Sequence, residues 1–167
     1  MSGYKIMKPI VIISLILSLS VLGCEQETKL AVIGDTAPNF SLSDIDGNKV
    51  SLNDLLKGKE VILNFWASWC PECRKETTVL NEIAKKYKDK IDIVGINLKE
   101  SKENVQSFVG SKGIGYKMLL DTKGKIARQY GVISLPVNVL INKEGLVKNL
   151  NIDIQQVESY LRTEPSL

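Results

Sequence analysis

The chain has 167 residues, of which 44% are apolar and 25% charged, a composition typical of one globular domain with a substantial core. Its formal net charge is +3, but Lys5 and Lys8 precede an apolar N-terminal run, which leaves 20 basic and 19 acidic side chains from residue 24 onward. This balance argues against a nucleic-acid-binding surface, and we expect no nucleic acid among the partners.

The N-terminal segment has the pattern of an export signal. Residues 10–22 form an uncharged run of 13 residues, within the roughly 7–15 of a signal-peptide core and short of the about 20 that span a membrane. The run ends at Gly23-Cys24, which resembles a bacterial lipobox, where the cysteine becomes the lipidated first residue. A short uncleaved anchor or an ordinary cleaved signal stays open, and all three place the domain outside the cytoplasm. The expected division is a signal peptide (1–23), a tether (24–33) and one domain (34–167).

The rest of the chain alternates between strand and helix patterns. In chain order, we expect strands at 35–42 and 46–52 around a turn at Asp46-Gly47, a helical turn at 53–56, a strand at 61–66, a helix at about 71–88, a strand at 91–98, a helix at 102–111, a strand or extended segment at 116–121, a short helix at 125–130, strands at 137–141 and 146–150 joined by a hairpin-type turn, and a closing helix at 154–161. This order implies an α/β fold with a mixed central sheet, helices on both faces and an N-terminal β-hairpin extension.

The motif Cys70-Pro71-Glu72-Cys73 carries the chemistry, because it stands between an apolar strand and a helix. A dithiol exchange centre needs an exposed, ionised first thiol, and a helix N-terminus supplies free N–H groups and a positive dipole end. The second thiol, one turn on, resolves the mixed disulfide. Structural zinc usually takes four Cys or His ligands, and this chain has no histidine and one CxxC. We therefore expect no metal and no cofactor other than the Cys70–Cys73 disulfide.

The chain resembles the thioredoxin superfamily, and more closely the ResA/TlpA-type membrane-tethered thiol-disulfide oxidoreductases. The resemblance rests on residues 34–40, 64–76, 130–132, 135–136 and 140–145. It implies a thioredoxin-like fold in which Cys70 is the nucleophile, Cys73 the resolving thiol and Pro136 a cis-proline facing them. The Leu135 backbone would then be free to pair with an extended substrate strand. An ordinary trans proline at 136 remains the alternative.

Glu76 is the candidate proton carrier. Thioredoxins have a buried Asp in the strand before the motif, where this chain has Asn64. On the helix, Cys73, Glu76 and Leu80 fall three and four residues apart, so we expect Glu76 on the inward face, with burial raising its pKa. ResA-type proteins have an acid here, and it could hold the proton that Cys73 exchanges. The alternative is a glutamate at the edge of that face that reaches solvent.

The remaining site residues are expected to contact substrate. Trp69 would offer an apolar surface to a partner, beside Pro71, Glu72 and Leu135. Glu72 has two interpretations: a solvated glutamate favoured by the helix dipole, or a charge that opposes ionisation of Cys70 and makes the dithiol more reducing.

These features predict an extracytoplasmic reductase of disulfides in envelope proteins, such as apocytochrome c or spore and surface proteins. We expect a monomer, held to the membrane by a lipid on Cys24 and re-reduced by a membrane thiol donor. A peroxiredoxin-like peroxidase would need a Thr three residues before its reactive cysteine, where Ala67 stands. A non-catalytic lipoprotein module is disfavoured by the intact CxxC with Pro136.

Overall fold

The computed structural model of the protein describes residues 29–163. The predicted signal peptide, Cys24 and the first part of the predicted tether lie outside the described residues. Among the residues described, no helix is both long enough and apolar enough to cross a membrane.

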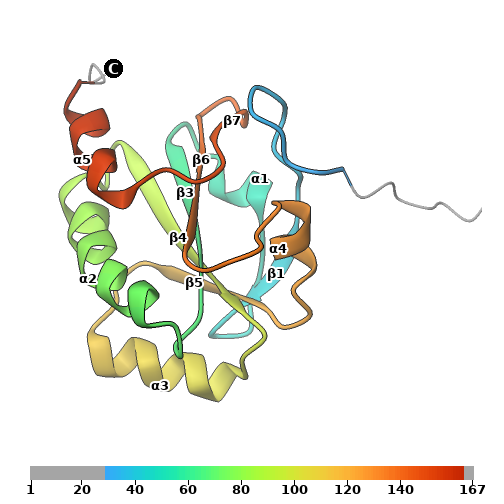
Figure 1. Ribbon diagram of the computed structural model, residues 1–167, viewed down its shortest axis with the longest axis vertical. Coiled ribbons are helices and arrows are strands. Elements are labelled where there is room, and N and C mark those ends of the chain that lie inside the picture. The colour runs from blue at the N-terminus through green and yellow to red at the C-terminus, as the bar shows by residue number, and fades with distance from the viewer. Residues whose placement is uncertain (1–28, 164–167) are drawn as a thin grey trace, which may run out of the picture.

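The described chain forms a central sheet with helices packed on both faces (Figure 1). Its elements in chain order are β1 (Ser41–Asp44), β2 (Lys49–Ser51), α1 (Leu52–Leu55), β3 (Glu60–Trp66), α2 (Pro71–Lys86), β4 (Ile91–Leu98), α3 (Lys102–Lys112), β5 (Lys117–Asp121), α4 (Lys125–Gln129), β6 (Val137–Ile141), β7 (Val147–Asn149) and α5 (Ile154–Thr163). The predicted α/β fold class, with its mixed sheet, is confirmed.

The sheet has seven strands in the order β2-β1-β5-β4-β3-β6-β7. The three central strands β5, β4 and β3 run parallel, and the pairs toward both edges are antiparallel. Side chains alternate across a strand, so β3 sends Val61, Leu63 and Phe65 to the core under α1 and α4. Ile62 and Trp66 face the core under α2, α3 and α5, which also contains both cysteines of the motif.

The N-terminal hairpin is present but shorter than predicted. Its strands are Ser41–Asp44 and Lys49–Ser51, and residues 35–40 contribute only an isolated bridge between Thr36 and Leu146. Pro38 lacks the N–H that a ladder needs. At the other end, β1 continues to Asp44, whose carboxylate accepts hydrogen bonds from the N–H groups of Asp46 (2.9 Å) and Asn48 (2.8 Å), and β2 begins only at Lys49 rather than at residue 46. The predicted long helix also ends earlier, at Lys86.

Candidate active site

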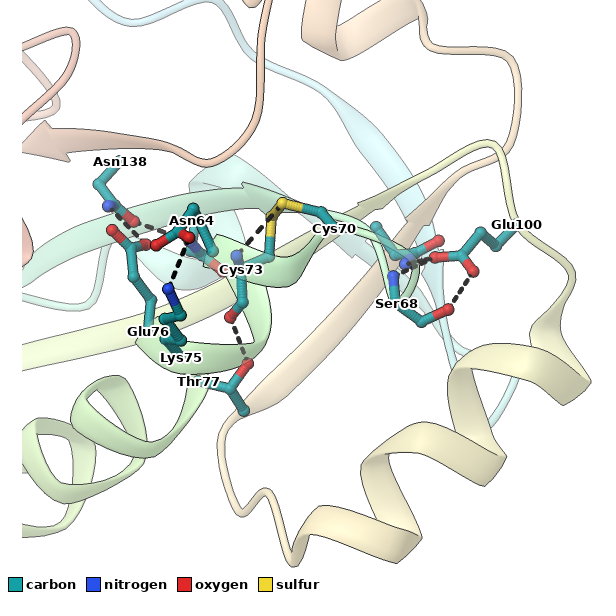
Figure 2. The surroundings of a disulfide bond; sticks show 11 residues. Asn64, Ser68, Cys70, Cys73, Lys75, Glu76, Thr77, Glu100 and Asn138 are labelled. Atoms are coloured by element: carbon teal, nitrogen blue, oxygen red, sulfur yellow. Dashed lines mark hydrogen bonds and ion pairs between the residues drawn. A yellow bond between two sulfur atoms is a disulfide. The ribbon is translucent and has the colours of Figure 1, made fainter.

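Cys70 and Cys73 are joined by a disulfide at the start of α2 (Figure 2). Strand β3 ends at Trp66, and a turn follows in which the N–H of Cys70 donates to the Ala67 carbonyl at 3.2 Å. Cys70 is the N-cap of α2, and its sulfur accepts a hydrogen bond from the N–H of Cys73 at 3.2 Å. The N-terminal N–H groups and the positive dipole end of α2 therefore face the Cys70 sulfur, where they favour a thiolate.

The two cysteines differ little in exposure in this oxidised state. Cys70 is 5% exposed and Cys73 2% exposed, so the order is as predicted, but Cys70 is not the exposed residue that the sequence suggested. The bond between the two sulfurs holds Cys70 against Cys73, in the core under α2. The exposed neighbour is Trp69, at 67%.

The loop before β6 lies at the same end of the sheet as the cysteines, because Val137 at the start of β6 pairs with Phe65 near the end of β3. The Leu135–Pro136 peptide is cis, as the resemblance implied. Leu135 is half-buried and packs against both core clusters, including the one that contains Cys70 and Cys73. Two residues earlier, Ile133 is 99% exposed, and the sequence did not single it out.

Pro71 and Glu72 are exposed in the first turn of α2. The Glu72 carboxylate forms an ion pair with Lys75 Nζ at 2.7 Å. Its position in the first turn suits both interpretations of Glu72, and the contact directs its charge toward Lys75.

Glu76 lies at the edge of the buried face of α2. The buried residues of this helix are Cys73, Thr77, Leu80 and Ile83, and Glu76 beside them is partly buried, which is the position expected of a carboxylate on the inward face. At 3.6 residues per turn, Thr77 rather than Glu76 follows Cys73 most closely around the helix, and its Oγ donates to the Cys73 carbonyl at 2.8 Å. Glu76 is half-buried, and this burial raises its pKa, as predicted in direction; a hydrogen bond from Asn138 opposes the rise, and the charges of Asp153 and Glu72 add to it.

Two buried asparagines connect Glu76 to the sheet, and sequence reasoning missed the second of them. Asn64 in β3 and Asn138 in β6 are register partners on the α2 face. Asn64 Nδ2 donates to Asn138 Oδ1 at 2.8 Å, and Asn138 Nδ2 donates to Glu76 Oε2 at 3.1 Å (Figure 2). The available signal was a single amide in the apolar strand Val137–Ile141, two residues after Pro136.

Glu100 is the second functional candidate that the sequence did not reveal. It follows β4, and its carboxylate accepts hydrogen bonds from the Ser68 N–H (2.7 Å), the Ser68 hydroxyl and Asn97 Nδ2 (2.7 Å). Ser68 belongs to the turn that ends at Cys70, so Glu100 connects the loop after β4 to the loop that carries the disulfide (Figure 2).

The arrangement can perform thiol-disulfide exchange. Once reduced, a Cys70 thiolate at the helix N-terminus can attack a disulfide, and Cys73 can resolve the mixed disulfide. Between residues 29 and 163, no cluster of three or more His, Cys, Asp or Glu side chains is placed to hold a metal ion.

Known proteins resemble this chain in sequence over most of its length. Residues 33–150 match the AhpC/TSA family. The thiol-disulfide oxidoreductase ResA of Bacillus thuringiensis (strain Al Hakam) is 42% identical over 134 residues, which cover 78% of this chain and 77% of that protein. The thioredoxin-like protein YneN of Bacillus subtilis (strain 168) is 36% identical over 122 residues, covering 71% of each chain.

A solved structure supports the fold as well. The thioredoxin domain of a thiol-disulfide oxidoreductase from Bacteroides vulgatus superimposes with a TM-score of 0.68 at 29% identity, covering 78% of this chain and 98% of that domain. The fold is thioredoxin-like, and the chain belongs to the AhpC/TSA family, among its thiol-disulfide oxidoreductases of the ResA type.

Proposed function

We propose that this thiol-disulfide oxidoreductase works as a reductase of protein disulfides outside the cytoplasm. The observation that carries the direction is the half-buried carboxylate of Glu76, one helical turn beyond Cys73 and hydrogen-bonded to Asn138. A negative charge near the thiols disfavours thiolate formation, and a less stabilised thiolate makes the reduced form a stronger reductant.

In the proposed cycle, the Cys70 thiolate attacks one sulfur of the partner's disulfide. The partner's other sulfur leaves as a thiolate and takes up a proton, and a mixed disulfide joins Cys70 to the partner. Cys73 then loses its proton, for which Glu76 is the proposed acceptor, and attacks the Cys70 sulfur. The partner leaves with two thiols, and the Cys70–Cys73 disulfide forms; two electrons have moved to the partner.

The proposed setting follows from the N-terminal segment. The short apolar run at 10–22 and Gly23-Cys24 support an exported protein with a lipid on Cys24. Its substrates would be disulfide-bearing envelope proteins, and a membrane thiol donor would restore the dithiol. Intact-mass measurement of membrane-extracted protein tests this setting: a chain that still starts at Met1 would mean an uncleaved anchor, and a free Cys24 thiol would exclude lipidation.

The direction is tested by redox equilibrium of the Cys70–Cys73 pair with a dithiol buffer of known potential. A reductase should equilibrate at or below about −270 mV, the region of thioredoxin, and should reduce the disulfides of insulin. A potential above about −180 mV, the region of disulfide isomerases, would contradict the proposed direction. Consumption of hydrogen peroxide at a comparable rate would instead favour the peroxidase alternative. A Cys73→Ser variant, which retains Cys70 but cannot resolve a mixed disulfide, should trap the partner for identification.

A further inference from the structure

We propose that Glu100 is a positioning residue that holds Cys70 at the N-terminus of α2 by fixing the turn before it. The inference rests on the proposed function only in taking Cys70 as the attacking thiol. Glu100 does not contact the sulfurs through any of its hydrogen bonds; it acts through Ser68, two residues before Cys70.

The contacts define a short connection between two loops (Figure 2). Both polar groups that Ser68 can donate, its N–H and its hydroxyl, go to the two oxygens of the Glu100 carboxylate. The oxygen that accepts the Ser68 N–H also accepts from Asn97 Nδ2 at 2.7 Å, and Asn97 is buried at the end of β4. The carboxylate is therefore held from the sheet side and itself holds the turn of residues 67–70.

The same turn sets the position of the attacking sulfur. Ser68 is its second residue, and the N–H of its last residue, Cys70, donates to Ala67. Cys70 then caps α2, with the N–H of Cys73 on its sulfur. If Ser68 loses its two acceptors, the turn gains freedom, and Cys70 can leave the N-cap position that favours its thiolate.

The backbone before Glu100 is arranged for this contact at a conformational cost. Lys99 has φ of 57°, the only positive φ at a non-glycine residue within 29–163, and its N–H donates to the Asp121 carbonyl at 3.2 Å. A left-handed residue of this kind persists where its surroundings determine it. Here it directs the next side chain, Glu100, back toward Ser68.

Two substitutions separate position from charge. Glu100→Gln removes the charge but keeps the length: its amide oxygen can accept from the Ser68 N–H and Asn97, and its NH₂ can donate to the Ser68 hydroxyl. Glu100→Ala removes charge and contacts together. Asp44→Ala is the matched control, because Asp44 anchors the β1–β2 turn by similar carboxylate-to-backbone bonds away from the disulfide.

The experiment measures alkylation of Cys70 by iodoacetamide in the reduced proteins across pH, without any partner protein. Near neutral pH, Cys70 of Glu100→Ala should react at least roughly ten times more slowly than Cys70 of Glu100→Gln, because its thiolate is no longer held at the helix N-terminus. Asp44→Ala should match the unmodified protein. Should Glu100→Ala fail to fold, Glu100→Asp, one methylene too short to hold both loops, takes its place with the same expectation.

A profile for the Ala (or Asp) variant that superimposes on that of the unmodified protein would overturn the proposal, since the contacts would then not matter. A Gln variant as slow as the Ala variant would overturn it too, because it would assign the effect to charge. Since no disulfide substrate is used, a failure of the proposed reductase direction leaves this test intact, and the two failures are distinguishable.

Discussion

Hydrogen bonds connect Asn64 to Asn138 and Asn138 to Glu76, and the variant Asn138→Val tests how much they stabilise the fold. Asn138 is 2% exposed and bonds to both neighbours. Valine is similar in size and suits a strand, but it leaves Asn64 Nδ2 without this acceptor and Glu76 without this donor. A buried unpaired amide costs about 1–3 kcal/mol. Loss of the hydrogen bond to Glu76 adds about 1 kcal/mol to this cost, the net value of a typical hydrogen bond, because water can partly replace it at the half-buried carboxylate.

We therefore expect Asn138→Val to lower the free energy of unfolding by about 2–4 kcal/mol, a large part of the about 5–15 kcal/mol of a typical domain. With a urea m-value of about 2 kcal/mol/M, the midpoint should fall by about 1–2 M. The assay is urea unfolding of the oxidised protein, followed by far-UV circular dichroism. The pKa of Glu76 should also rise further, because the Asn138 hydrogen bond is what opposes its elevation.

A double-mutant cycle provides the control. Asn64→Val/Asn138→Val removes donor and acceptor together, so it should cost less than the sum of the two single changes. An unchanged midpoint for Asn138→Val, or costs that simply add in the double variant, would refute the idea that the two amides stabilise each other.

Three further predictions concern the site. Cys70→Ser should abolish disulfide reductase activity, and alkylation of the reduced protein followed by peptide mass spectrometry should label Cys70 before Cys73; equal rates would contradict the asymmetry. In the oxidised protein neither thiol titrates, and the raised pKa of Glu76 means that the folded state favours its protonated form. The contribution of Glu76 to the free energy of unfolding is therefore fully present below its ordinary pKa of 4.5 and is lost as pH rises through the folded pKa. Glu76→Gln, which does not titrate, should lack this loss of stability. Urea midpoints of the two proteins should thus coincide in acid and diverge in favour of the Gln variant toward neutrality; parallel midpoints at all pH values would place Glu76 in water. Trp69→Ala should lower kcat/KM for a protein disulfide about tenfold while leaving reduction of a small aromatic disulfide nearly unchanged, since a well-packed aromatic contact contributes about 1–2 kcal/mol; equal losses on both substrates would mean that Trp69 acts on the thiols instead.

The sequence predicted best what depends on neighbouring residues. The continuous apolar runs of β3 and β4 indicate buried parallel strands, and the motif at residues 70–73 follows directly from the first of them. Helix periodicity also placed Glu76 near the buried face, although it could not separate position 76 from position 77, which differ by only 100° around the helix.

What the sequence could not predict depends on contacts between distant segments. Asn138 reaches Glu76 across 62 residues, and Glu100 reaches Ser68 across 32. Each pairing needs the strand register: Asn64 and Asn138 meet because β3 and β6 align them, and a shift by one residue would send either amide to the opposite face. The second hairpin strand was overestimated because the Asp44 side chain competes with the backbone ladder for the N–H groups of Asp46 and Asn48.

The N-terminal hairpin also affects how the protein meets unfolded chains. Because β1 pairs with β5 and β2 covers β1, the two outermost strands of the sheet are β2 and β7, each three residues long. Long unpaired strand edges are templates for aggregation with other extended chains. At either edge this sheet offers an extended chain a backbone ladder of only three residues, which limits association of this kind.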